Sequence, residues 1–184
     1  MKTSVFCGVS VDGFLARTNH TFDFLDAGGQ TPHGYDEFYA GVDVVVIGRN
    51  TFEVVQSFGQ WPYGQKLVIV LSSRPLELSS IKGVVEQMSG SPAAIVAHLS
   101  ARGCENAYID GGITIQRFLA AGLIDRLIVT RVPVLIGTGI PLFGPLPRDI
   151  ILRHVATRCY DGGLAQSEYE PVAAPSASQG VSPT

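Results

Sequence analysis

Short runs of apolar residues, rich in valine and isoleucine, recur along the chain between glycines and longer helix-like segments. These runs do not alternate with polar residues, which is typical of strands buried on both faces of a parallel or mixed sheet. We therefore predict strands over residues 4–10, 43–48, 66–73, 106–112 and 125–137.

Helix signals lie between the predicted strands. A serine followed by proline opens residues 91–103, which stop at a glycine, and a threonine opens residues 114–122, which also stop at one. Shorter helices are predicted over 35–41 and 50–58. Strands that alternate with helices are the signature of an α/β layer fold.

The C-terminal third changes character. Residues 150–160 and 164–172 alternate polar and apolar positions around an Asp-Gly-Gly turn, which predicts an antiparallel hairpin. The predicted fold class is α/β, with a mixed, mostly parallel central sheet flanked by helices and closed by this hairpin. We expect one domain over 1–172 and a disordered tail over 173–184, where small and polar residues dominate.

Composition narrows the class of protein. The 184 residues suit one domain, and their net charge of −3 argues against a nucleic-acid partner and a polybasic membrane patch. No apolar run reaches the ~18 residues of a membrane span. Charged residues make up 16% of the chain, below the roughly 25% average. We therefore expect a homodimer, with residues 126–136 as the contact.

Cysteine and histidine suggest no metal centre. Cys7, Cys104 and Cys159 form no Cys-x-x-Cys pair, and the four histidines have no ligand spacing. Cys7 lies in an apolar strand pattern, where a cysteine is usually a small buried hydrophobe. The N-terminus lacks the long apolar core of a signal peptide. These features predict a reducing, cytoplasmic setting.

Three strand ends carry residues suited to anions. Residues 48–51 (GRNT) combine a glycine turn, an arginine and a threonine that can cap a helix. Residues 71–75 (LSSRP) offer two hydroxyls and a guanidinium, which suit a phosphate. Residues 110–114 (DGGIT) place paired glycines before a helix capped by threonine. Taken singly, each is better explained as a plain helix start or polar turn; together they fit a phosphorylated dinucleotide.

The ordered set GVSVDGFLA, IGRNTFEVV, VLSSRP and YIDGGITIQRFL resembles the dihydrofolate reductase superfamily, and so does the closing hairpin YDGGLAQSEYEPV. The likeness covers about residues 2–172 and includes the reductase domain of riboflavin-biosynthesis deaminase–reductases. It implies an NADPH-dependent enzyme that transfers a hydride to a pyrimidine- or pterin-like heterocycle. The nearest match is the 5-amino-6-(5-phosphoribosylamino)uracil reductase type. Dihydrofolate reduction and a non-catalytic NADPH-binding module are the alternatives.

The resemblance also implies roles for the cofactor residues. The pyrophosphate and the 2′-phosphate side of NADPH would be held by Gly48, Arg49, Asn50 and Thr51, and the 2′-phosphate and ribose by Ser72, Ser73 and Arg74. The pyrophosphate would also be bound by Gly111, Gly112, Ile113 and Thr114. The nicotinamide would be lined by Gly8, Val9 and Ala16.

The substrate side departs from the family. Hydride transfer requires a proton source near the nicotinamide, and Asp36 and Asp12 are the predicted catalytic acids. A solvated carboxylate is the alternative for Asp36, and a turn residue the alternative for Asp12. The segments NHTFDFLDAGGQTPHG (19–34) and FGQWPYG (58–64) replace the usual substrate motifs, so only the cofactor half resembles the family. Trp61 and Tyr63 are candidates to wall a flat ring, and packing against the core is the alternative.

Overall fold

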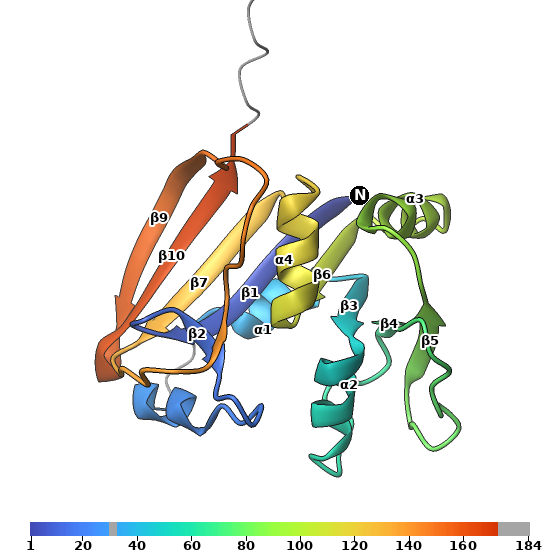
Figure 1. The fold of residues 1–184 in the computed structure, drawn as a ribbon, viewed down its shortest axis with the longest axis horizontal. Coiled ribbons are helices and arrows are strands. Elements are labelled where there is room, and N and C mark those ends of the chain that lie inside the picture. Colours follow the sequence, from blue (N-terminus) through green and yellow to red (C-terminus); the bar gives the residue numbers. More distant parts are fainter. Residues whose placement is uncertain (30–32, 173–184) are drawn as a thin grey trace, which may run out of the picture.

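The computed structural model describes residues 1–29 and 33–172, and its centre is one eight-stranded sheet (Figure 1). The strand order is β5-β4-β3-β6-β1-β7-β10-β9. Their bounds are β1 Lys2–Ser10, β3 Val44–Gly48, β4 Leu67–Leu71, β5 Val84–Met88, β6 Asn106–Asp110, β7 Arg126–Val132, β9 Leu152–Tyr160 and β10 Leu164–Pro171.

Six neighbouring strands, from β5 to β7, pair in parallel. β10 pairs antiparallel with both β7 and β9 and completes the sheet at one edge. The predicted fold class is therefore confirmed: a mixed, mostly parallel sheet with a C-terminal antiparallel hairpin. The predicted tail, 173–184, lies outside the described residues.

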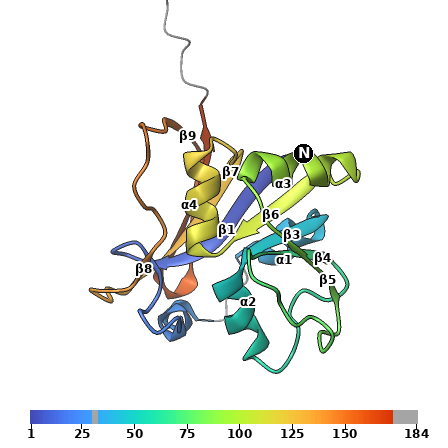
Figure 2. The same cartoon turned by 45° about the vertical axis from the view of Figure 1, so that its right-hand side comes forward.

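Helices cover both faces of the sheet. α3 (Pro92–Ala101) and α4 (Gly112–Ala120) lie on the same face, while α1 (Tyr35–Ala40) lies behind the sheet (Figures 1 and 2). α2 (Arg49–Gln56) continues directly from β3 and packs its buried Phe52 and Val55 into the same apolar cluster that α1 joins. Each face thus has its own core, as the predicted α/β layers require.

The two cores differ in composition. The core under α3 and α4 is mainly aliphatic and contains Ile95, Ile115 and Phe118. The core on the α1 and α2 side is rich in aromatic rings, among them Phe6 and Tyr108. The hydroxyl of Tyr108 donates a 2.8 Å hydrogen bond to the carbonyl oxygen of Phe6, so this buried polar group is satisfied.

Smaller elements close the carboxyl end of the sheet. β2 (Phe14–Ala16) pairs antiparallel with β8 (Ile140–Pro141), and the short helix η1 (Asp23–Gly28) packs against β1 and β7. A Cβ added at Gly8 would lie 2.9 Å from Leu25 of η1, so the glycine lets this helix approach the sheet. The second short helix, η2 (Asp161–Gly163), forms the predicted hairpin turn.

Three strands were missed, namely β5 and the short pair β2 and β8, and one predicted strand ends well before its expected end. β5 was not predicted, because its burial pattern is partial and its sequence contains Glu86 and Gln87. The strand predicted over 125–137 ends at Val132, because Pro133 follows and cannot donate a ladder hydrogen bond.

Candidate active site

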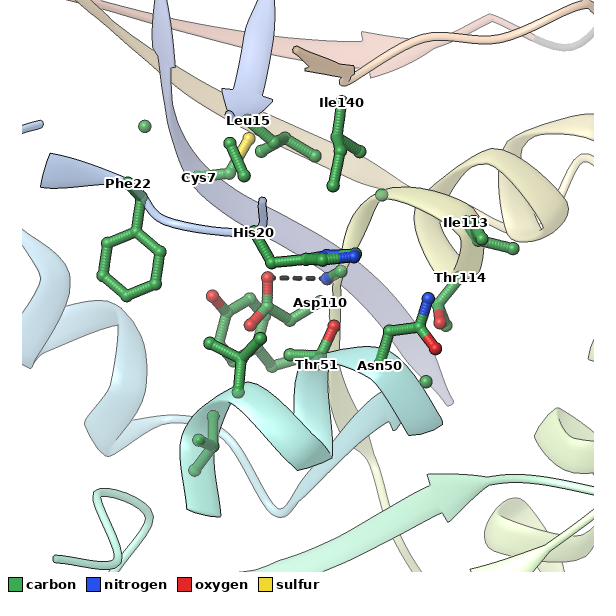
Figure 3. A pocket seen from close by; sticks show the side chains of 18 of the residues that line it. Cys7, Leu15, His20, Phe22, Asn50, Thr51, Asp110, Ile113, Thr114 and Ile140 are labelled. Atoms are coloured by element: carbon green, nitrogen blue, oxygen red, sulfur yellow. Dashed lines mark hydrogen bonds between the residues drawn. The ribbon is translucent and has the colours of Figure 1, made fainter. Parts of the chain in front are cut away.

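A cavity of about 590 Å³ lies at the carboxyl ends of β1, β3 and β6 (Figure 3). β6 lies between β3 and β1 in the sheet, and the chain leaves these strands toward opposite faces. In open α/β sheets, ligands bind in the crevice formed at such a point. The topology alone therefore marks this crevice as the candidate binding site.

Two helices begin at the wall of this cavity. α2 starts after Gly48 and α4 starts after Gly111, and no side chain caps either N-terminus. The predictions that Thr51 and Thr114 act as caps are wrong, since each lies within the first helical turn. Glycine at the capping position leaves the first N–H groups free to bind an anion.

The glycine turns bring the two helix starts into contact. Gly111 has a φ of +89°, and a Cβ there would lie 2.2 Å from the hydroxyl oxygen of Thr51. A Cβ at Gly48 would lie 2.8 Å from the hydroxyl oxygen of Thr114. In Figure 3, Asn50 and Thr51 of α2 accordingly lie opposite Ile113 and Thr114 of α4. Any larger residue would push the two N-termini apart.

Arg49 has an unused hydrogen-bonding group in this region. Its Nε donates to Glu53 at 2.6 Å, whereas its Nη1 is buried and makes no hydrogen bond in the described part of the chain. A buried polar atom without a partner is costly. A phosphate at the two helix starts would supply an acceptor, so these residues fit the pyrophosphate of a dinucleotide.

Asp110 lies near the centre of the cavity, at the end of β6 (Figure 3). Its Oδ1 accepts a 2.7 Å hydrogen bond from the backbone N–H of Gly111. Burial raises the pKa of this carboxyl to about 6, although the Gly111 hydrogen bond acts in the opposite direction. A carboxyl with a pKa in this range is suited to deliver a proton near neutral pH.

Aromatic and apolar side chains wall the rest of the cavity, beyond Asp110. They come from β1 and β6, from the segment between β2 and α1, from the first residue of α1, and from the end of α2 and the loop that follows it. The aromatic members are Phe6, Phe22, His33, Tyr35, Phe58, Tyr63 and Tyr108. Such walls bind flat rings.

Most of the predicted cofactor residues meet in this cavity. Its lining includes ten of the fourteen: Gly8, Ala16, Gly48, Arg49, Asn50, Thr51, Gly111, Gly112, Ile113 and Thr114. Val9 does not line it, because its side chain is buried in the aliphatic core. The roles proposed for these residues stay predictions, but the structure brings the residues together.

The predicted 2′-phosphate residues lie beside the cavity, not in its lining, at the end of β4. The Ser72 hydroxyl bonds the backbone of Arg74 and holds the turn. Gln87 of β5 donates to the carbonyl oxygens of both residues. Ser73 and Arg74 are exposed, and the Arg74 guanidinium pairs with no acid in the described part of the chain.

The two predicted catalytic acids lie outside the cavity lining. Asp36 is exposed on α1. Asp12 accepts hydrogen bonds from the backbone N–H groups of Ile136 and Gly137. The hydrogen bond from Ser10, foremost, lowers the pKa of Asp12, and the two backbone bonds act in the same direction. Its catalytic role stays a prediction, yet the carboxyl has the environment of a turn residue.

Among the lining residues that the sequence analysis missed, two carry charged groups. Asp110 was quoted within DGGIT but given no role, although a carboxylate directly after a buried apolar strand was a usable signal. Arg117 lies one turn beyond Thr114 and has no sequence motif of its own. Its guanidinium donates to the carbonyl oxygen of Gly90 at 3.2 Å.

Within the described residues, no group of three or more His, Cys, Asp or Glu could hold a metal ion. The same part of the chain contains no helix long and apolar enough to cross a membrane.

The sheet order and the cavity define a dihydrofolate reductase-like α/β domain. The chain belongs to the RibD C-terminal domain family, whose model matches residues 2–165. It is 33% identical to YwjB of Bacillus subtilis (strain 168) over 171 residues, 91% of this chain and 97% of that protein.

Two solved structures extend the comparison. A putative riboflavin biosynthesis protein from Shewanella sp. PV-4 is 35% identical, with a TM-score of 0.88, and the match covers 94% of this chain and 100% of that one. The dihydrofolate reductase of Enterococcus faecalis, solved with NADP(H) and RAB-propyl, is 17% identical with a TM-score of 0.63. That match covers 92% of this chain and 96% of the reductase, and it supports the fold.

Proposed function

We propose that the protein is an NADPH-dependent reductase that transfers a hydride to a pyrimidine- or pterin-like heterocycle. One observation carries the proposal: an anion-binding pair of helix starts, a carboxyl with a raised pKa and an aromatic wall share one cavity. The relationship to reductase domains and to a putative riboflavin biosynthesis protein supports it.

The chain's own residues would bind the cofactor from one side of the cavity. The free N–H groups at the starts of α2 and α4 would bind the pyrophosphate, together with Nη1 of Arg49. Arg74 would bind the 2′-phosphate from the exposed turn after β4. When bound, NADPH supplies the hydride.

Asp110 is our candidate for the proton donor. Reduction of a C=N or C=O bond consumes one hydride and one proton, and the protonated carboxyl would supply the proton to the atom that gains negative charge. Solvent would then restore the proton to the carboxylate. Because the pKa is about 6, the protonated fraction and the rate should fall as the pH rises above that value.

The first experiment measures NADPH affinity by calorimetry and NADPH oxidation by absorbance, against pyrimidine and pterin substrates. We expect binding and turnover of at least one ring. Binding without turnover on any ring would favour the alternative of a non-catalytic NADPH-binding module, and absence of binding would remove the cofactor proposal.

A pair of variants tests the proton donor. Asp110→Asn should lower kcat by about 10²–10⁴-fold, the usual contribution of a general acid, while NADPH affinity stays near that of the unaltered protein. Asp36→Asn is the matched control, because it neutralises an exposed carboxylate outside the cavity. If Asp36→Asn lowered kcat and Asp110→Asn did not, Asp36 would be the acid, as the sequence predicted.

A further inference from the structure

The aromatic half of the cavity contains no strong cation. Its walls come from β1, from residues 20–25 and 33–35, from residues 54–63, and from Tyr108 of β6. Residues 18–48 contain no lysine or arginine, and neither do residues 50–65. The absence of lysine and arginine is read from the sequence, so it includes residues 30–32.

The same stretches carry acidic residues. Between Arg17 and Arg49 the chain contains five carboxylates and no strong base: Asp23, Asp26, Asp36, Glu37 and Asp43. Arg17, at the boundary of this stretch, is already bound to both carboxylate oxygens of Asp23, at 2.8 and 3.0 Å. Asp110 adds a further carboxyl within the cavity itself.

The two arginines that line the cavity lie on the cofactor side. Arg49 begins α2, and Arg117 belongs to α4, which begins at the glycine turn. Among the described lining residues, the remaining basic side chains are the imidazoles of His20 and His33. The ring of His33 lies 5.7 Å from that of Phe6, within the aromatic wall.

From these observations we infer that the substrate is a flat heterocycle without a phosphate group. This inference rests on the proposed function and narrows its substrate class. A phosphate ester needs arginine, lysine or an open helix start. The aromatic half offers the two imidazoles and the starts of η1 and α1, whose first turns already carry carboxylates: Asp23, Asp26, Asp36 and Glu37. A phosphate placed beside Asp110 without a matching cation would be repelled and desolvated. The chain therefore differs from reductases whose substrate carries a phosphoribosyl group.

The test uses two matched pairs of rings: 5-amino-6-ribosylaminouracil with its 5′-phosphate, and riboflavin with its 5′-phosphate, FMN. Each is titrated by calorimetry into the full chain saturated with NADP⁺, so that the cofactor's phosphate sites are filled. We expect the unphosphorylated member of at least one pair to bind about tenfold or more tightly than its partner. Equal or tighter binding of both phosphorylated members, or no binding of either unphosphorylated ring, overturns the inference.

A failure of the cofactor proposal has a different signature. It shows as an absence of heat when NADP⁺ alone is added, before any ring is tested. In that case the ring titrations are repeated with Arg49→Ala, which removes the cation at the helix starts, and the same two outcomes decide the inference.

A gain-of-function variant examines the electrostatic cause. Phe58 lines the cavity and is 49% exposed, so replacing it should not disturb the core. Phe58→Arg should tighten binding of the phosphorylated rings by about tenfold, the effect of one charge-assisted hydrogen bond. Phe58→Met, a neutral side chain of similar size, is the control and should not. An equal gain in both variants, or none in Phe58→Arg, would contradict the proposed basis of selectivity.

Discussion

At the residue scale, Arg49 shows why a charged side chain follows a buried strand. One of its nitrogens, Nε, is satisfied within α2, where Glu53 lies one turn further on and accepts the hydrogen bond. A second nitrogen, Nη1, is buried and meets no acceptor among residues 1–29 and 33–172. This division lets one residue stabilise the helix and still bind an anion beside the helix start.

Arg74→Ala should weaken NADPH binding by about 1.5–3 kcal/mol, the contribution of a hydrogen bond to a charged group, and leave NADH binding nearly unchanged. The reason is that only NADPH carries the 2′-phosphate. Calorimetric titration of both cofactors measures the difference. Arg148→Ala, which removes an equal charge from an exposed position beside a different pocket, is the control. Equal losses of binding free energy for NADPH and NADH would show that Arg74 does not bind the 2′-phosphate.

Asp110 should cost the protein stability at neutral and alkaline pH. Its folded-state pKa is raised from 3.8 to about 6, so the folded chain binds the proton more tightly than the unfolded chain does. The favourable contribution of protonated Asp110 to the free energy of unfolding is therefore fully present below the pKa of the unfolded chain. It is lost as the pH rises through the pKa of the folded chain.

Asp110→Asn should accordingly raise the free energy of unfolding by about 1–3 kcal/mol near pH 8 and change it little near pH 4. Urea unfolding at the two pH values measures this difference. A variant equally stabilised at both values would show that the titration of Asp110 is not the cause.

The residue scale also shows the limit of sequence inference. Gly48, Arg49 and the paired glycines were predictable because turn chemistry and a family resemblance both mark them. Asp110 was not, since its raised pKa arises from burial in the folded chain, where residues as far away in the sequence as Tyr35 line the same cavity. Local sequence shows that a carboxylate follows an apolar strand, but it contains no record of the shifted pKa.

At the element scale, the site depends on two helix starts that touch. Gly111 has a positive φ and leaves room for Thr51, so α4 can begin beside α2. A conformation in this region costs an L-residue about 1–3 kcal/mol, and here a Cβ would also meet a hydroxyl of the neighbouring helix.

Gly111→Ala should therefore lower stability and weaken NADPH binding by tenfold or more, because the two helix starts must separate. A binding site tolerates a shift of only a few tenths of an ångström. A tenfold loss corresponds to about 1.4 kcal/mol of binding free energy. Gly122→Ala is the matched control. It follows the other end of α4, also has a positive φ of +66°, and a Cβ there meets nothing within 4 Å. Gly122→Ala should lower stability and leave NADPH affinity unchanged. Thermal unfolding measures the stability of both variants, and calorimetry measures their NADPH affinity. Similar NADPH affinities of Gly111→Ala and Gly122→Ala would argue that the contact between the starts of α2 and α4 does not matter for binding.

Elements with strong local signals were predicted, and those held by tertiary contacts were not. α3 has a serine that accepts from the N–H of Ala94, a proline in its first turn and a glycine after its end, so its bounds were legible. β5 pairs with a single neighbour, β4, and carries polar residues. Its Gln87 binds the loop that presents Arg74, which the sequence does not reveal.

At the scale of the whole molecule, the outer hairpin leaves apolar surface uncovered. β9 is the edge strand, and nearly all of its residues are exposed, including Leu152 and Val155; the adjoining Ile151 is 61% exposed. The region predicted as a dimer contact, 126–136, has its strand β7 between β1 and β10, so most of its apolar side chains are buried within the chain. An uncovered edge of this kind is normally paired or protected.

We propose that a second copy of the chain covers this edge. The protein should then sediment at twice its mass of 19.6 kDa at micromolar concentration.

Val155→Glu would place a charge on the apolar edge and shift the protein toward the monomer. Val84→Glu, on the opposite edge strand and 44% exposed, should leave the dimer intact. The cavity lies at the carboxyl ends of β1, β3 and β6, away from β9 in the strand order, so the monomer should retain NADPH affinity. Sedimentation of the unaltered chain as a monomer would refute the dimer, and dissociation by Val84→Glu alone would move the interface to β5.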